Sequence, residues 1–409
     1  MERTILHCDC NAFYASVETL LDPTLADGPS AVCGDPESRH GIILAKNEQA
    51  KACGVQTAET IWQAKRKCPS LRLVAPHREE YVKYSRRCNE LYLQYTDLVD
   101  PFGIDESFLD VTGSMHLFGT GAEIADTLRR RMREEIGLTI SVGVSFNRAF
   151  AKLGSDYKKP DATTVFSRKN YRERVWPLPV SALLYVGKRT LGQLNRLGVR
   201  TIGDLAACDP VALHHILGKS GETLLRYARG EDTEPVRSFY AERAVKSVGN
   251  SMTFAHNLIG EEACRMGLSA LCDNVGRRLR SRQLVCQTVQ LGIRDPEFRN
   301  RSRQITLEQP TNVTRVLLDA AMTLLHTHWT PDKPVRLLCV TAANLLPENT
   351  ACEQLSLFDA AGALQQRDRQ HKLDQTVDAL RRKFGEQSVI FGYSVPKPDK
   401  NDPNHHDQP

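Results

Sequence analysis

The N-terminal segment reads as a buried strand that ends in an acidic residue and runs directly into a helix. Residues 4–10, TILHCDC, have the length and apolar character of a buried β-strand, and apolar residues recur at helical spacing in FYASVETLL, residues 13–21. This order places Asp9 at the exposed end of the strand. A carboxylate is costly to bury unless it is paired or binds a cation. The segment therefore predicts a β-α unit with an acidic functional group at its edge.

Length and composition indicate a globular chain of several domains. The 409 residues predict two to four domains, and 41% hydrophobic with 25% charged residues excludes a mainly disordered, collagen-like or coiled-coil protein. No apolar run reaches the roughly 18 residues of a membrane span, and the N-terminus lacks the apolar core of a secretion signal. We therefore expect a cytoplasmic protein with no membrane association, whose twelve cysteines are reduced thiols.

Strand and helix patterns alternate along the first part of the chain. Residues 99–113 read as two strands with acidic residues at their junction, and residues 137–166 read as strand, helix and strand. Residues 19–78 read as an insertion with one strand and two short helices. This order predicts an α+β fold in which helices cover one side of an antiparallel or mixed sheet. After residue 168 short helices follow, and a new α/β unit begins near residue 243.

Three acidic residues occupy positions at which a chain normally has apolar ones: Asp9, and the pair Asp105 and Glu106 in GIDESFLD. Clustered carboxylates repel one another unless a divalent cation lies between them, and Mg²⁺ prefers oxygen ligands. Two such ions can activate a hydroxyl and neutralise a leaving pyrophosphate in phosphoryl transfer. The alternative is that each motif is an ordinary turn with no role.

Three motifs, in this order along the chain, resemble those of the Y-family DNA polymerases, and most closely their DinB-type branch: DCNAFYASVE at 9–18, GIDESFLDVT at 103–112 and LGSDYKKPD at 153–161. The likeness extends from residue 4 to about residue 348. It implies a multidomain α+β right-hand polymerase with a ferredoxin-like palm, small fingers, a helical helix-hairpin-helix thumb and an α/β little finger. The implied boundaries are 1–12 and 79–167 for the palm, 13–78 for the fingers, 168–231 for the thumb, 232–242 for a linker, 243–348 for the little finger, 349–394 for a clamp-binding peptide and C-terminal helix, and 395–409 for a disordered tail.

The resemblance also implies the catalytic residues. Asp9, Asp105 and Glu106 match the catalytic carboxylates of the family, and they would hold two Mg²⁺ ions together with the backbone carbonyl of Cys10. Lys159 matches the lysine that reaches the incoming triphosphate.

Tyr14 matches the steric gate of the family, a ring that excludes a ribose hydroxyl by a built-in clash. Phe13 is expected to pack beneath it. The alternative for Tyr14 is an ordinary core aromatic residue at a helix start.

The predicted fingers depart from the family pattern. Glu48 and Lys51 stand where members often have Tyr and Arg, so Lys51 keeps the charge without the planar fork of arginine, and Glu48 is expected to turn away from a triphosphate. Ile42 and Leu44 stand where the family often has smaller residues, which predicts a tighter roof over the nascent base pair. Asn11 replaces a second aspartate and is expected to matter little.

A segment after the predicted palm resembles a helix-hairpin-helix. Gly187 and Lys188 open a helix that Gly198 ends, and glycine lets a phosphate approach the backbone N–H groups at a helix start. This predicts DNA binding without sequence preference, and an ordinary helix start is the alternative.

Arginines in the predicted little finger indicate a second DNA-binding surface. Arg299, Arg301 and Arg303 recur at a spacing of two, which places them on one face of a strand, near Arg294. Residues 243–348 contain 14 Lys+Arg and 9 Asp+Glu, which accounts for the whole net charge of +5. These arginines are predicted to follow a DNA backbone, with a solvated sheet edge as the alternative.

A short peptide after the predicted little finger resembles the bacterial sliding-clamp binding motif. It offers a glutamine for hydrogen bonds and leucine and phenylalanine anchors for an apolar pocket. A linker that folds onto its own domain is the alternative, and a helix is predicted to follow near residues 371–384. The peptide comprises Gln354, Leu355, Ser356, Leu357 and Phe358.

Together these features predict a monomeric, template-directed DNA polymerase of the low-fidelity translesion type, which adds dNTPs to the primer of a primer-template DNA. We expect no proofreading, recruitment by the β subunit of the bacterial sliding clamp, and association with the nucleoid during repair. The alternative is a non-catalytic DNA-binding scaffold of the same fold at the clamp. The complete carboxylate set favours the polymerase.

Overall fold

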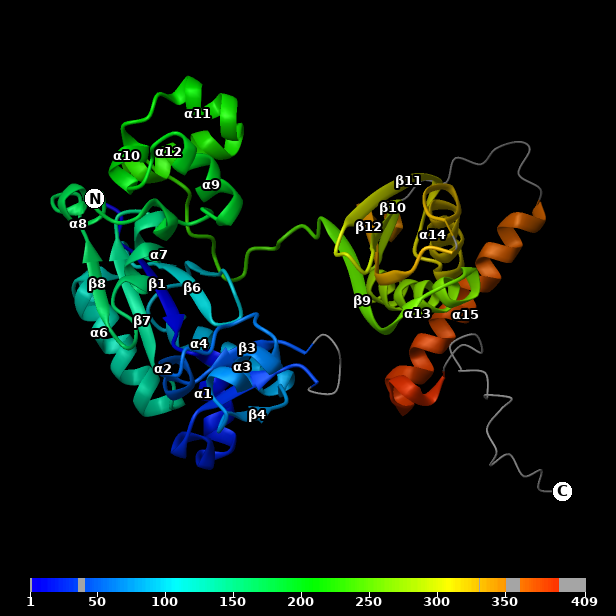
Figure 1. The fold of residues 1–409 in the computed structure, drawn as a ribbon, viewed down its shortest axis with the longest axis horizontal. Helices are drawn as coiled ribbons and strands as arrows, with labels where there is room; N and C mark the ends of the chain where they lie inside the picture. The colour runs from blue at the N-terminus through cyan, green and yellow to red at the C-terminus, as the bar shows by residue number, and fades with distance from the viewer. Residues whose placement is uncertain (1, 36–40, 331, 351–360, 390–409) are drawn as a thin grey trace. The chain divides into compact units, whose positions relative to one another are not determined.

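The computed structural model describes residues 2–35, 41–330, 332–350 and 361–389. They form two compact units that divide between Glu242 and Arg243, here called the N-terminal and C-terminal units (Figure 1). The predicted clamp-binding peptide and the predicted tail lie outside the described residues. The finer division into palm, fingers, thumb and little finger stays a prediction.

A mixed five-stranded sheet forms the centre of the N-terminal unit, with strand order β5-β6-β1-β7-β8 (Figure 1). β1 is antiparallel to both of its neighbours, β6 and β7, whereas β8 is parallel to β7. Every residue of β1 is buried, as its apolar sequence predicts. The strands are β1 Ile5–Cys10, β5 Val99–Pro101, β6 Glu106–Asp110, β7 Ile140–Ser145 and β8 Thr163–Phe166.

Helices cover both faces of this sheet, so the prediction of a one-sided cover is wrong. Leu6 and Cys8 of β1 pack on the side of α4 (Arg78–Tyr92) and α6 (Gly121–Arg131). The alternate residues of β1 face α7 (Arg148–Tyr157), because successive side chains on a strand point to opposite faces. The period of each helix is visible in the sequence, but the face on which it packs is a tertiary property.

The α7 helix lies unusually close to β7. A Cβ atom on Gly143 would lie 1.9 Å from the carbonyl oxygen of Ala151, and one on Gly154 would lie 2.9 Å from the Cα of Gly143. Both distances are far below van der Waals contact, so only glycine fits at this crossing.

The insertion that follows α1 (Phe13–Leu21) contains more strands than predicted. A small sheet of order β3-β2-β4 accompanies the two short helices that were expected. Its strands have three or four residues, too few for their period to stand out in the sequence. The elements are β2 Ser30–Cys33, β3 Ile43–Lys46, α2 Glu48–Ala52, α3 Ile61–Lys67 and β4 Arg72–Val74.

Short helices complete the N-terminal unit after β8 and share a second apolar core with α7 and β8. They are α8 Tyr171–Arg174, α9 Lys188–Arg196, α10 Ile202–Ala206, α11 Pro210–Leu217 and α12 Lys219–Arg229. One further α-helix, α5, spans Met115–Phe118, a π-helical turn spans Met132–Ile136, and 3₁₀ turns span Pro23–Asp27 and Val180–Ala182.

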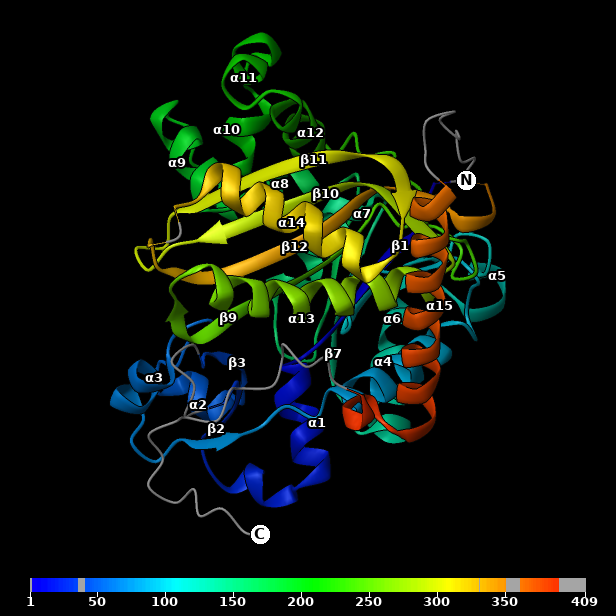
Figure 2. The ribbon, with the colours of Figure 1, turned by 90° about the vertical axis from the view of Figure 1, so that its right-hand side faces the viewer.

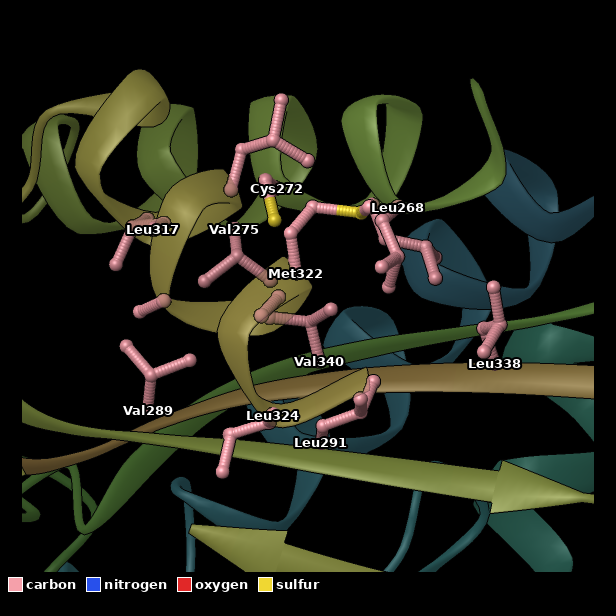
Figure 3. Close-up of a cluster of buried hydrophobic side chains, with 14 of the residues drawn as sticks. Leu268, Cys272, Val275, Val289, Leu291, Leu317, Met322, Leu324, Leu338 and Val340 are labelled. Carbon is pink, nitrogen blue, oxygen red and sulfur yellow. The ribbon is translucent and has the colours of Figure 1, made fainter. Parts of the chain in front are cut away.

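The C-terminal unit is an antiparallel four-stranded sheet of order β11-β10-β12-β9, with α13 and α14 on one face (Figure 2). Apolar side chains of both helices meet those of the strands in one core, shown in Figure 3. The elements are β9 Ser247–Leu258, α13 Glu261–Arg280, β10 Leu284–Arg294, β11 Asn300–Thr311, α14 Thr314–His328 and β12 Val335–Pro347.

A long helix, α15 (Ala361–Phe384), packs on α13 and contains the helix predicted near residues 371–384. Val377 of α15 is buried, and buried ion pairs join Arg280 of α13 to two aspartates of α15. Short 3₁₀ turns span Glu348–Thr350 and Glu386–Ser388. Among the described residues no helix is both long and apolar enough to cross a membrane.

Candidate active site

Three carboxylates meet at one edge of the five-stranded sheet. Asp9 of β1 lies opposite Glu106 of β6 in the strand register, so the two side chains share a face. Asp105 directly precedes β6, and its carbonyl oxygen accepts a hydrogen bond from the Cys10 N–H at 2.9 Å. The sheet pairing therefore brings together acidic residues that are almost one hundred positions apart in the sequence.

These carboxylates line a pocket of about 460 Å³ between the sheet edge and the insertion. The structure brings every residue predicted for catalysis, metal binding and nucleotide binding to this pocket. Its lining includes Asp9, Cys10, Phe13, Tyr14, Lys51, Asp105, Glu106 and Lys159.

Lys152 of α7 is a site residue that sequence reasoning missed. Its ammonium group lies 2.8 Å from Asp9 Oδ2 and 2.7 Å from Glu106 Oε2. Lys159 lies 2.8 Å from the other oxygen of Asp9 and 2.8 Å from Asp156. Nothing in the sequence signals this role of Lys152, because a lysine on a helix is usually solvated and Lys159 lies beyond the end of α7.

The pKa values of the neighbouring carboxyls of Asp105 and Glu106 are shifted in opposite directions. Burial, together with the charges of Asp9 and Glu106, raises the pKa of Asp105 to about 6. Burial also acts to raise the pKa of Glu106, but contacts from His7 and the Lys152 ammonium outweigh it and lower this pKa to about 2. For Lys152 itself burial is outweighed by Asp9 and Glu106, so its pKa is raised and the amine stays charged.

His7 lies beneath the carboxylates on the same face of β1. Its Nε2 is 3.3 Å from Glu106 Oε2, and its Nδ1 is 2.9 Å from the Ser155 hydroxyl. Burial lowers the pKa of His7, so the ring is neutral. We therefore interpret His7 as a support for Glu106.

The donor set fits a hard divalent cation. Ligand atoms of His7, Asp9 and Glu106 lie within 4.8 Å of one another, and one oxygen each of Asp9 and Glu106 already contacts the same ammonium group. Asp105 adds a third carboxylate to the pocket wall. Oxygen ligands of this kind are those that Mg²⁺ prefers.

Tyr14 and Phe13 open α1 directly after the strand. Phe13 is 3% exposed in the core, and the half-buried Tyr14 lines the pocket. The neighbouring Asn11 is 8% exposed and bonds with its side chain to Ser141 and Thr139, so its amide has a structural role.

The insertion contributes an opposite wall of the pocket. Glu48 lines the pocket beside Lys51 and pairs with it at 3.2 Å, so the expectation that Glu48 turns away is wrong. Leu44 also lines the pocket, whereas Ile42 is more exposed and forms a bridge with Thr60.

The predicted helix-hairpin-helix has open backbone at its glycines. Gly187 is the N-cap of α9, and Gly198 follows that helix with a φ of +77°. A Cβ atom at either position would meet nothing within 4 Å. Lys188 is the first residue of α9, at the helix end where an anion is favoured.

The arginines of the C-terminal unit do not form the single surface that their spacing predicted. Arg301 and Arg303 lie opposite Ile293 and Leu291, which are core residues, so both point to the helix-covered side. Consistently, the Arg301 guanidinium lies 5.7 Å from the Trp329 ring.

Arg294 and Arg299 have different surroundings from that pair. Arg294 lies on the other face of the sheet, opposite Asn300. Arg299 precedes β11 and pairs with Asp295 at 2.7 Å and with Glu297 at 3.0 Å. A spacing of two identifies a shared face but does not say which face it is.

The fold and the pocket together define a polymerase of the right-hand type. Residues 8–156 match the family model described as impB/mucB/samB family, and residues 245–357 match the model of that family's C-terminal domain. The chain belongs to this family, the Y-family DNA polymerases of DNA polymerase IV type, and it is a DNA-directed DNA polymerase of the translesion class.

Similar proteins cover nearly the whole chain. DNA polymerase IV of Acetivibrio thermocellus is 47% identical over 96% of this chain and 97% of its own length. DNA polymerase IV 1 of Bacillus subtilis is 35% identical over 97% of this chain and 94% of its own length. A solved Y-family DNA polymerase chimera matches with a TM-score of 0.75 and 23% identity, over 84% of this chain and 99% of the chimera, which supports the fold. Primer-template DNA and dNTPs are therefore the substrates.

Proposed function

We propose that the enzyme extends a primer by phosphoryl transfer at Asp9, Asp105 and Glu106, with two Mg²⁺ ions held by these carboxylates and the Cys10 carbonyl. When bound, the ions would lower the pKa of the primer hydroxyl and neutralise charge on the phosphates. One observation carries this proposal: oxygens of Asp9 and Glu106 converge on a single cationic group, with Asp105 beside them in the same pocket.

The other pocket residues bind and orient the nucleotide in this proposal. Lys159 and Lys51 attract the triphosphate, and the Glu48 carboxylate moderates the charge of Lys51. Tyr14 excludes a ribose 2′-hydroxyl, and Phe13 supports the start of its helix.

Primer extension by Asp105→Asn and Glu106→Gln tests the assignment of the site. Each variant should lose at least about 1000-fold in synthesis, because two-metal catalysis requires the full set of carboxylates. Affinity for primer-template should stay within a few-fold. Asp126→Asn, an exposed carboxylate on α6, is the control and should retain synthesis. Normal synthesis by Asp105→Asn or Glu106→Gln would favour a DNA-binding scaffold over this catalytic site.

Recruitment by the sliding clamp is a separate part of the proposal, and the match of residues 354–358 to the clamp-binding motif supports it. Deletion of these residues should weaken clamp-stimulated synthesis and leave basal synthesis intact. Loss of basal synthesis would instead indicate a role of the segment in folding.

We also infer that synthesis occurs without proofreading, by a monomer, at the DNA of the bacterial cytoplasm and nucleoid. Within the described residues, one group of three candidate metal ligands is found, and it belongs to the polymerase pocket. The positive surplus of residues 243–348 supports DNA binding by the C-terminal unit.

A further inference from the structure

Tyr14 is backed by a second aromatic ring. Its ring stacks on that of Tyr81 with centroids 4.2 Å apart and an interplanar angle of 16°. Tyr81 lies in the first turn of α4, is 1% exposed, and also contacts Phe13 across 6.2 Å. Tyr14 therefore cannot move toward α4 unless a closely packed ring moves first.

A buried carboxylate holds Tyr81 in this position. Glu18 lies one helical turn after Tyr14, so both side chains project from the same side of α1. The Tyr81 hydroxyl donates a hydrogen bond to Glu18, which is 2% exposed. Burial and this hydrogen bond raise the pKa of Tyr81, so the phenol remains a donor.

His77 completes the network around the Glu18 carboxylate. Its backbone N–H donates to Glu18 Oε1 at 3.1 Å, and its Nδ1 lies 2.9 Å from Oε2. Each carboxylate oxygen therefore has a partner, as a buried charge requires. Two contacts therefore hold the Tyr81 ring: its hydroxyl bonds to Glu18, and its face stacks on Tyr14.

We propose that Glu18 and Tyr81 are positioning residues for sugar selection, and that they hold the Tyr14 ring against retreat from the nucleotide sugar. This inference rests on the proposed function of Tyr14 as the gate. Exclusion by a clash works only if the excluding group is stiff, because a ring that yields by a fraction of an ångström relieves the repulsion. The selectivity of the gate then depends on two side chains behind it.

The test compares single-nucleotide insertion of a dNTP and of the matching NTP by the full-length enzyme. The ratio of the two kcat/KM values reports the gate, because a loss of folded enzyme lowers both values equally. Tyr81→Phe and Glu18→Ala should each lower the preference for dNTP by about 3- to 10-fold, and Tyr14→Ala by about 100-fold or more. Tyr92→Phe, which changes another buried tyrosine about three turns further along α4, is the matched control and should leave the ratio unchanged.

The outcomes separate this inference from the proposed gate. An unchanged ratio in Tyr14→Ala would show that Tyr14 does not act as the gate. A lowered ratio in Tyr14→Ala, with unchanged ratios in both Tyr81→Phe and Glu18→Ala, would overturn the positioning role alone.

A double variant tests whether Glu18 acts through Tyr81. Glu18→Ala and Tyr81→Phe remove the same hydrogen bond, so the double variant should lower the ratio no further than the larger single effect. Fully additive effects would show that the two residues act independently and would overturn the proposed network.

Discussion

Two buried clusters in this protein each hold a cation between two carboxylates, but the groups that surround the cation differ. In the C-terminal unit, Arg280 binds Asp374 at 3.0 Å and Asp378 at 2.7 Å, and it also donates to Asn312 and Thr314. In the N-terminal unit, Lys152 binds Asp9 and Glu106 in a similar way. There, however, Asp105 adds a further carboxylate, and all three carboxylates line the pocket that holds the predicted catalytic residues.

This difference separates a structural charge cluster from a functional one. The planar guanidinium of Arg280 uses its donors on partners from α15 and from the start of α14, which fixes the long helix on the C-terminal unit. Beside Lys152, burial together with the charges of Asp9 and Glu106 raises the pKa of Asp105, so this carboxyl lies in surroundings that disfavour its charged form. An incomplete cluster of this kind favours binding of additional cations.

The largest effect on stability is expected from Arg280→Ala. The change leaves two buried aspartates without their cation, which should lower the free energy of unfolding by about 3–5 kcal/mol. Urea denaturation measures this loss. Arg315→Ala, which removes an exposed pair with Asp319, is the control and should cost about 0–1 kcal/mol. Equal losses in the two variants would contradict the interpretation of Arg280 as the centre of a structural cluster.

The second prediction concerns Lys152, whose ammonium group contacts the same oxygens that would bind a metal ion. Lys152→Met should increase Mn²⁺ affinity by about tenfold, because it removes a competing positive charge about 3 Å from the ligands. Electron paramagnetic resonance of free Mn²⁺ measures binding without any need for activity. Weaker Mn²⁺ binding would mean that Lys152 orients the carboxylates more than it competes with the ion.

The third prediction is a pH dependence of stability in metal-free buffer. The pKa of Asp105 rises from 3.8 to about 6 on folding, so the folded protein holds this proton more tightly. Stability should therefore increase as the pH falls from about 7 to about 5, with a Tm change of a few degrees. Asp105→Asn should remove this slope, and a persistent slope would assign it to another group.

Glu106 should act in the opposite direction at lower pH. Its pKa falls from 4.5 to about 2 on folding, so its stabilising contribution is present above its ordinary pKa and is lost as the pH falls through about 2. Glu106→Gln should flatten this acid branch of the stability curve.

The smallest effect is expected at the apolar wall of the pocket, away from both charge clusters. The double variant Ile42→Ala, Leu44→Ala should improve bypass of a bulky template adduct by a few-fold, because it removes side-chain volume from the pocket wall at Leu44 and from the more exposed Ile42 two positions before it. Primer extension past the adduct measures this change, with an undamaged template as the control. Equal bypass by the wild type and the double variant would contradict the prediction of a tighter roof.

The local elements of the fold could be predicted from the sequence more fully than their arrangement. The strand that ends at Asp9 and Cys10 and the helix that starts at Phe13 follow from composition and period. The face on which α7 packs does not, because it depends on the crossing at Gly143 and Gly154. The order of the motifs indicated the family resemblance, but it did not say on which side of the sheet each helix packs.

The candidate site shows the same limit. Asp9, Asp105 and Glu106 could be identified because acidic residues stand out in apolar strands. Lys152 could not, because a lysine on a helix is usually solvated, and its role follows only from the sheet that faces it. Likewise, the face of Arg301 depends on its pairing with Ile293, which the spacing of arginines does not encode.

The close crossing of α7 and β7 sets the reach of Lys152. Because Gly143 and Gly154 have no side chains, the helix backbone rests almost directly on the strand, and Lys152 extends to Asp9 and Glu106 from that height. A single methyl group at Gly143 would act as a spacer that lifts the helix. Such a substitution would behave as an active-site mutation although it adds no atom to the pocket. The distance between Lys152 and the two carboxylates therefore depends on the absence of side chains at Gly143 and Gly154.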